Sequence, residues 1–234
     1  METINTLALT LGAGWAAGIN LYAAVFVLGY LGTTGHVVLP PGLEVLSDPL
    51  VMAVAGVMYC VEFFADKTPG VDSGWDTLHT FIRIPAGALL AAGAASGFEV
   101  NQAAELAAAL VGGTLAAGSH FTKAGSRLLI NTSPEPVTNW TASILEDLAV
   151  IGGLWTALNY PVAFLVLLAI FVALVIWFLP KLWRALRRLF QRIGQFFGGK
   201  GERPQEGLHT PEEREDEMRQ LFPPGDKPVE GSKK

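Results

Sequence analysis

The sequence predicts an all-α integral membrane protein with about six transmembrane helices, and composition and patterning support this. Of the 234 residues, 51% are hydrophobic and only 16% are charged, whereas a soluble domain usually carries about 25% charged residues. Long apolar runs dominate up to about residue 180, and the chain is mostly polar after residue 200. We therefore expect a transmembrane domain over 4–180, a basic amphipathic juxtamembrane helix over 181–198 and a flexible cytoplasmic tail over 199–234.

Six apolar segments are each near the roughly 20 residues that cross a bilayer core. Met1-Glu2 lacks the positive charge that opens a signal peptide, so the first segment is expected to remain as a span. The third could begin as early as Ser73. A very short turn at Asn159-Tyr160-Pro161 separates the last two. The expected spans are residues 7–31, 49–65, 77–96, 103–130, 140–158 and 162–179.

The placement of lysine and arginine agrees with six spans. The connections 33–48, 97–102 and 159–161 contain no basic residue, while basic residues flank the other connections and follow the last span. The positive-inside rule makes the basic side cytoplasmic. Because the number of spans is even, both termini are predicted to be cytoplasmic.

Two pairs of similar segments suggest an internal repeat. Residues 16–24 (AAGINLYAA) resemble residues 116–124 (AAGSHFTKA), and residues 65–69 and 157–161 share their Ala and Pro positions. Three helices per unit would place the two copies in opposite orientations, which is a common plan of transporters and some channels. The predicted units are residues 7–98 and 103–179, with chance similarity between Ala- and Gly-rich helices as the alternative.

Small residues and a basic segment predict further contacts. Gly14 and Gly18 form a G-x-x-x-G step, which allows close helix packing within the chain or in a homo-oligomer. Residues 181–193 alternate basic and apolar side chains at helical spacing. We expect residues 181–197 to bind anionic lipids of the cytoplasmic leaflet, with simple anchoring of the topology as the alternative. A short helix is expected in the tail, from Thr210 to about Phe222.

The segment from Glu62 to Arg83 concentrates ionisable residues between two apolar segments. Such groups cost about 2.5–3.5 kcal/mol each at membrane depth and usually mark a functional site. Glu62 and Asp66 have i, i+4 spacing, and Asp72, Asp76, His79 and Arg83 would form one stripe on a helix. His120, Lys123 and Arg127 share a face of the fourth helix, and Glu146 and Asp147 lie within the fifth.

Buried ions need partners, so we predict that Arg83 or Arg127 pairs with Glu62 or Asp66. Three interpretations of the charged segment remain open. It could be an ordinary solvated interface, a cation or proton site in a transporter or channel, or a divalent-cation site in a membrane enzyme. Apart from such a cation, no cofactor is predicted. Potential metal ligands are Glu62, Asp66, Asp72 and Asp76.

These considerations define the candidate residues. Substrate- or ion-binding candidates are Glu62, Asp66, Lys67, Asp72, Asp76, His79, Arg83, Lys123 and Arg127; pathway-lining candidates are Asn20, His120, Glu146 and Asp147.

Residues 14–22 (GWAAGINLY), together with the pattern Glu62-Phe63-x-Ala65-Asp66-Lys67-x-Pro69-x-x-Asp72-x-x-x-Asp76-x-x-His79-x-x-Ile82-Arg83, resemble an uncharacterised bacterial membrane family, domain of unknown function 4126. The resemblance covers about residues 7–180. It implies a multi-pass protein of the bacterial cytoplasmic (inner) membrane and no established activity.

We expect a transporter or channel for a small solute or ion that uses the charged cluster in its cytoplasmic half. The alternatives are a metal-dependent enzyme acting on lipid or lipid phosphate at the inner leaflet, and a membrane scaffold. The expected partners are the lipid bilayer and a small solute or ion, with no nucleic acid.

Overall fold

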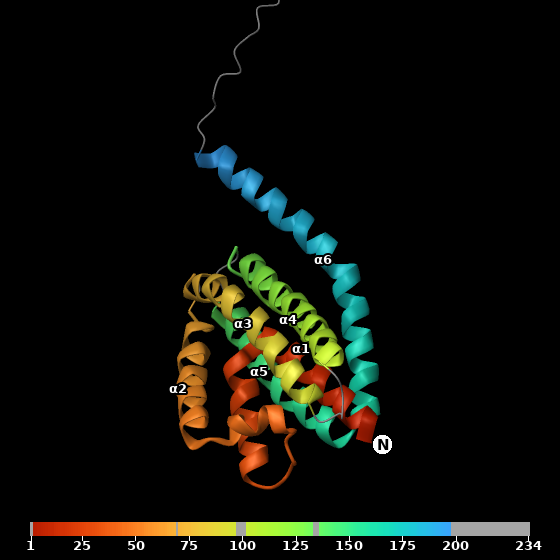
Figure 1. Cartoon of the computed structure of the whole chain (residues 1–234). Coiled ribbons are helices and arrows are strands. Elements are labelled where there is room, and N and C mark those ends of the chain that lie inside the picture. The colour runs from red at the N-terminus through yellow and green to blue at the C-terminus, as the bar shows by residue number, and fades with distance from the viewer. Residues whose placement is uncertain (1, 69, 97–101, 133–135, 198–234) are drawn as a thin grey trace, which may run out of the picture. The chain divides into compact units, whose positions relative to one another are not determined.

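A computed structural model describes residues 2–68, 70–96, 102–132 and 136–197, and these residues form helices and no strand (Figure 1). The all-α prediction is confirmed. The elements in chain order are α1 (Glu2–Thr33), the 3₁₀ helix η1 (Pro41–Ser47), α2 (Pro49–Ala65), α3 (Val71–Ala95), α4 (Gln102–Ile130), α5 (Pro136–Asn159) and α6 (Pro161–Phe197).

The contacts divide the chain into one compact unit of residues 1–188 and a second of residues 189–234. The first contains the helix bundle and all the residues discussed below. The second contributes the end of α6. The tail predicted at 199–234 and its short helix lie outside the described residues.

Helices α1, α3 and α4 form the centre of the bundle and touch through small residues. A Cβ atom on Gly14 of α1 would lie 2.7 Å from the Cα of Gly112 on α4, and one on Gly112 would lie 2.8 Å from the carbonyl oxygen of Gly87 on α3. Gly18 lies against Ser119 and the backbone of Ala116 in the same way. The G-x-x-x-G step therefore joins helices within the chain, because backbones can approach this closely only where side chains are absent.

The other helices attach to this trio through larger side chains. The ring of Trp15 packs edge-on against Phe164 and Phe171 of α6, with ring centroids 6.0 Å apart in both pairs. The same ring covers Gly153 of α5, where a Cβ atom would clash with it. Within the bundle of residues 1–188, α2 and α6 lie at opposite edges (Figure 1).

Helix α1 is broken at Asn20, whose backbone angles are non-helical (φ −146°, ψ 98°). The Asn20 side chain accepts a hydrogen bond from the Ala23 amide at 2.9 Å, so it caps the second half of the helix. Asn20 is 1% exposed. An irregular backbone at membrane depth is tolerated only where it is buried in protein or lines a cavity, and the break meets this condition.

Two boundaries differ from the sequence-based expectation. The third helix starts at Val71, because Asp72 accepts a hydrogen bond from the Gly70 amide at 2.9 Å and stabilises an earlier first turn. The last helix continues through Pro180 to Phe197, so residues 181–197 extend the last span without a break. The remaining helices begin and end within a few residues of their expected limits.

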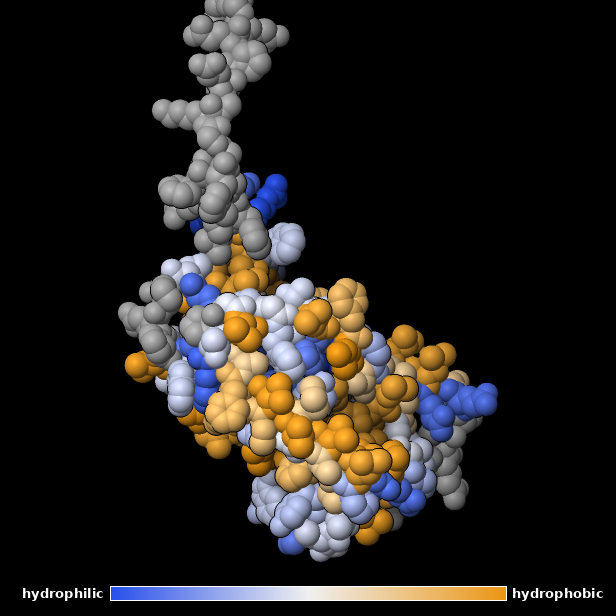
Figure 2. Space-filling view, turned by 90° about the vertical axis from the view of Figure 1, so that its left-hand side faces the viewer, coloured by the Kyte–Doolittle hydropathy of each residue, from blue (hydrophilic) through white to orange (hydrophobic). Residues whose placement is uncertain are grey.

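Four helices of the described residues are long and apolar enough to cross a membrane: Thr3–Thr33, Val71–Ala95, Val137–Asn159 and Pro161–Arg188. A fifth is possible if Pro41–Ser47 and Pro49–Ala65, which are bent by 69°, count as one broken span. Helix α4 does not reach this apolarity, so six spans remain a prediction. Hydrophobic side chains gather across the middle of the face shown in Figure 2, as expected of a protein that contacts lipid.

Candidate functional site: a buried ion network

Seven charged side chains from four helices meet inside one end of the bundle. Helices α2 and α4 end where α3 and α5 begin, so the polar stretches of all four lie at the same end. We use the name buried ion network for the side chains connected by nitrogen–oxygen distances within 4.0 Å. These are Glu62, Asp66, Asp76, Arg83, Lys123, Arg127 and Glu146.

Arg83 forms the centre of the network on α3. Its Nη2 atom donates to Glu62 Oε1 at 2.5 Å, and its Nη1 atom donates to Asp76 Oδ1 at 3.0 Å. The side chains of Arg83 and Glu62 are 0% exposed. The ion pair predicted from the sequence is therefore present, with Arg83 and Glu62 as the partners.

Lys123 on α4 uses all three of its N–H groups inside the network. It donates to Asp66 Oδ2 at 2.7 Å, to Glu62 Oε1 at 3.2 Å and to the carbonyl oxygen of Ile19 at 3.1 Å. In a regular helix the Ile19 carbonyl would accept from the Ala23 amide. That amide donates instead to Asn20, so the break in α1 makes a backbone acceptor available to Lys123.

Arg127 connects the network to α5. It donates to both carboxylate oxygens of Glu146, at 3.2 Å and 2.6 Å, and to the carbonyl oxygen of Asp66 at 2.8 Å. A further short hydrogen bond goes to the side chain of Asn139. Bidentate arginine–carboxylate contacts fix geometry as well as charge.

The network contains one more acid than base, because four carboxylates face three cationic groups. All three bases lie on the inner helices α3 and α4, whereas α2 and α5 supply every acid except Asp76. One oxygen each of Glu62, Asp66 and Asp76 is buried and has no hydrogen-bond partner in the described residues. Buried carboxylate oxygens are stable only when paired, so this part of the network can accept a further positive group.

Two buried histidines lie beside the network, and their ring nitrogens are hydrogen-bonded. Nδ1 of His120 lies 3.2 Å from Arg83, which can only donate, so the proton of His120 is on Nε2 and points to Thr80 at 2.7 Å. Nδ1 of His79 donates to the Trp75 carbonyl at 2.9 Å, and Nε2 shares a hydrogen bond of 3.0 Å with the Tyr22 hydroxyl. Both side chains therefore connect neighbouring helices through hydrogen bonds: His120 joins α4 to α3, and His79 joins α3 to α1.

Three further candidates flank the network. Asp147 accepts from Asn20 at 3.0 Å, so these two expected pathway residues are in contact. Lys67 donates to Ser143 at 3.2 Å, and burial lowers the pKa of its ammonium group against the opposing effect of the Asp147 carboxylate. Asp72 lies apart from the ion pairs and accepts from Asn131 at 2.8 Å and 2.9 Å.

The four carboxylates proposed as metal ligands do not converge on one point. In the part of the chain that the structure describes, no three His, Cys, Asp or Glu side chains are arranged to hold a metal ion. Glu62, Asp66 and Asp76 face Arg83 and Lys123, and Asp72 faces Asn131. Their use as metal ligands therefore stays a prediction without geometric support.

Sequence reasoning missed several uncharged partners. Tyr22, Thr80, Asn131, Asn139 and Ser143 each hydrogen-bond to a residue of the charged group. Asn131 and Asn139 lie on either side of the short connection from α4 to α5, near the end of the bundle that holds the network. The available signal for Asn131 and Asn139 was that they are polar and close in sequence to Arg127 and Glu146.

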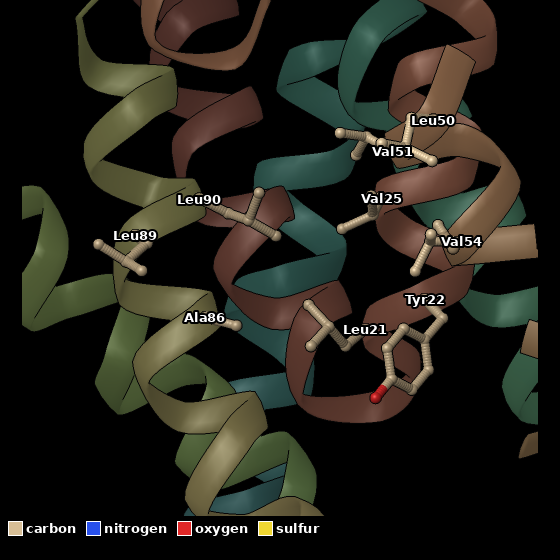
Figure 3. A pocket seen from close by; sticks show the side chains of 10 residues that line it. Leu21, Tyr22, Val25, Leu50, Val51, Val54, Ala86, Leu89 and Leu90 are labelled. Atoms are coloured by element: carbon tan, nitrogen blue, oxygen red, sulfur yellow. The ribbon is translucent and has the colours of Figure 1, made fainter. Parts of the chain in front are cut away.

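Two kinds of cavity lie beside the network. An apolar groove of about 500 Å³ opens between α1, α2 and α3, with the hydroxyl of Tyr22 at the end away from Leu50 (Figure 3). A smaller cavity of about 230 Å³, between α1, α4, α5 and α6, is lined by Lys123 and Glu146 of the network itself.

These observations define a class of protein: a helical membrane protein with a buried, partly unpaired ion network in one half of its bundle. Residues 7–181 match the sequence model of the family described as Domain of unknown function (DUF4126), and the chain belongs to this family. The comparisons found no matching curated protein and no matching solved structure.

Proposed function

We propose that this protein is a transporter or channel for a small ion or solute, with the buried ion network as its binding or coupling centre. The observation that carries the proposal is the excess of one acid in a largely buried network, together with the unpaired oxygens of Glu62, Asp66 and Asp76. A protein that maintains an unneutralised charge at membrane depth needs a mobile positive partner, such as a proton or cation.

The broken helix supports the same proposal. Discontinuous helices whose freed backbone groups face the binding site are a feature of secondary transporters. In α1 the break at Asn20 frees the Ile19 carbonyl, which accepts a hydrogen bond from Lys123 of the network. A change in the charge of the network would therefore act directly on the bend of α1.

We further propose six spans arranged as a 3+3 inverted repeat, in which α1 corresponds to α4 and α2 to α5. Two observations support this correspondence. The similar segments 16–24 and 116–124 pack against each other through Gly18 and Ser119, and α2 and α5 both supply acids to the network. The positive-inside rule then places both termini in the cytoplasm of a bacterium and residues 181–197 at anionic lipids. A homo-oligomer stays open.

The direct test is flux into proteoliposomes containing the purified full chain, with sodium, potassium and proton gradients applied separately. We expect flux with the wild type and at least a tenfold loss with Asp76→Asn, which keeps the size of the side chain but removes its charge, an effect of about 1.4 kcal/mol or more. Glu44→Gln, an exposed acid on η1, is the matched control. Absence of flux under every gradient would reject the proposal.

The same preparations address the other functions. A scaffold should tolerate Asp76→Asn and lose its activity when residues 181–197 are deleted. A metal-dependent lipid enzyme should convert lipid phosphate only when a divalent cation is added.

A further inference from the structure

The cavity of about 230 Å³ is the place where the buried ion network reaches the surface of the bundle. Its walls include Ser119, Thr122 and Ser126 of α4, Glu146 of α5 and Phe171 of α6. One water molecule needs about 10–15 Å³ by the same measure. The cavity is therefore large enough for a small ion together with part of its hydration shell.

The three hydroxyl groups of this cavity can only accept hydrogen bonds from a ligand. Ser119 donates its proton to a backbone carbonyl at 2.9 Å, Thr122 donates to the Gly118 carbonyl at 2.7 Å, and Ser126 donates to the Thr122 carbonyl at 2.7 Å. A hydroxyl has one proton and two lone pairs. With each proton directed to the backbone, the oxygens can offer only lone pairs to the cavity.

Of the two charged residues that line the cavity, Glu146 brings acceptor oxygens, and Lys123 brings a positive charge 3.7 Å from Glu146 but no free N–H group. Lys123 directs its three N–H groups to Asp66, Glu62 and the Ile19 carbonyl, so none is left for the cavity. The Glu146 side chain is 18% exposed, and each of its oxygens accepts one hydrogen bond from Arg127. A carboxylate has about four lone-pair positions, so Glu146 retains acceptor capacity. The wall thus presents oxygen acceptors beside a network with one excess acid.

We propose that this cavity binds a small monovalent cation and is its access route to the buried ion network. Ser119 and Ser126 lie two turns of α4, about 10 Å, apart, so a cation moving along the cavity would meet the oxygens of Ser119, Thr122, Ser126 and Glu146 in succession, with water completing its shell. Such oxygen acceptors suit sodium, potassium, ammonium or hydronium. A neutral or anionic solute would find no hydrogen-bond donor among these groups. The inference rests on the proposed function and specifies both the charge of the ligand and its route.

The test measures binding and flux separately on the full chain. Binding is followed as thermal stabilisation of the purified protein when sodium, potassium or ammonium chloride replaces N-methylglucamine chloride at constant ionic strength and pH. A pH series at fixed N-methylglucamine concentration reports on hydronium. Because a ligand that binds only the folded state raises its stability, the wild type should be stabilised in at least one of these four arms.

Two variants on one face of α5 form the matched pair. Ala149 lines this cavity and also a neighbouring cavity without charged residues, whereas Thr156, two turns further along the helix, lines only the neighbouring one of the two. Ala149→Phe should fill the cation cavity and abolish both stabilisation and flux, while Thr156→Phe should leave both unchanged. Thr122→Val keeps the volume and removes one acceptor, so its apparent affinity should fall about tenfold or more.

The outcomes separate this inference from the proposed function. Flux that depends on Asp76 but is unchanged in Ala149→Phe and Thr122→Val would overturn the cavity inference and leave the transport proposal standing. Cation binding that is lost in Ala149→Phe, without flux in the wild type, would support the cavity and reject transport. Equal stabilisation by every salt, N-methylglucamine included, and no effect of pH would overturn the inference.

Discussion

Arg83 and Glu62 form an ion pair of 2.5 Å between α3 and α2 in which neither side chain has any exposed surface. Two ions in such surroundings depend on each other, because each would lose most of its favourable solvation if its partner were removed. The pair also joins helices that otherwise meet at few places, since α2 lies at the edge of the bundle (Figure 1).

The first prediction concerns this pair. Arg83→Leu should destabilise the protein by about 3–5 kcal/mol, because it removes the arginine that Glu62 and Asp76 share. Glu62→Leu should cost less, because Arg83 keeps Asp76, Lys123 keeps Asp66, and the network is left with equal numbers of acids and bases. The double variant Glu62→Leu with Arg83→Leu should lose less than the worse single variant. Chemical unfolding in detergent micelles provides the measurement. Additive losses from the two single changes would show that the residues act independently.

The second prediction concerns the contact between α1 and α4. Gly18→Ala should destabilise the bundle by about 1–3 kcal/mol, because the added methyl group would clash with the Ser119 hydroxyl and the Ala116 backbone. Gly118→Ala is the matched control, since its methyl group would meet only Val175, at 4.0 Å. That variant should be neutral or slightly stabilising because alanine favours helix. Equal melting temperatures of the two variants would contradict the packing described here.

The third prediction concerns the break in α1. Asn20→Ala should cost about 1 kcal/mol for the lost cap and more for the Asp147 carboxylate that it leaves unpaired. Asn20→Ser should retain the capping oxygen and lie between wild type and Asn20→Ala. Asn20→Asp keeps the cap but places a second carboxylate beside Asp147, so it should be worse than Asn20→Ser. Thermal unfolding measures the three midpoints. A midpoint of Asn20→Ala equal to that of the wild type would contradict the capping role of Asn20.

The fourth prediction concerns topology. Cys60 is the only cysteine in the sequence, so Cys60→Ser gives a cysteine-free background. If α2 crosses the membrane, a cysteine at Thr34 and one at Thr68 lie on opposite sides. A membrane-impermeant maleimide should label Thr34→Cys in intact cells and Thr68→Cys only after permeabilisation. Labelling of both in intact cells would mean that α2 does not span.

The sequence was sufficient to predict the six long helices, though not η1, and to predict the charged residues that form the network. The stripe of Asp72, Asp76, His79 and Arg83 is buried along α3 as helical spacing requires, and the pairing of Arg83 follows from the cost of burying an ion alone. Neither the buried stripe nor the ion pair needs tertiary information to be predicted, because helical spacing and the charge of a side chain can both be read from the local sequence.

Other features required coordinates. Asn20, at the break in α1, donates to Asp147, which lies 127 residues later in the chain, and no local pattern reveals that contact. The continuation of α6 through Pro180 was missed because proline usually weakens a helix interior. Asp72 was expected in the charged cluster, but it accepts hydrogen bonds from the Gly70 amide at the start of its own helix and from Asn131.

The glycine contacts fix α1, α3 and α4 against sliding, because backbones that touch without intervening side chains fit in one register only. Helices α2 and α5 have no comparable seam with each other and are attached to the trio partly by the acids they contribute. Neutralising those acids would therefore loosen the outer pair while the inner three stay rigid. If the proposed proton or cation binding takes place, its first effect would therefore be on the attachment of α2 and α5, and the glycine contacts of the inner helices would be unchanged.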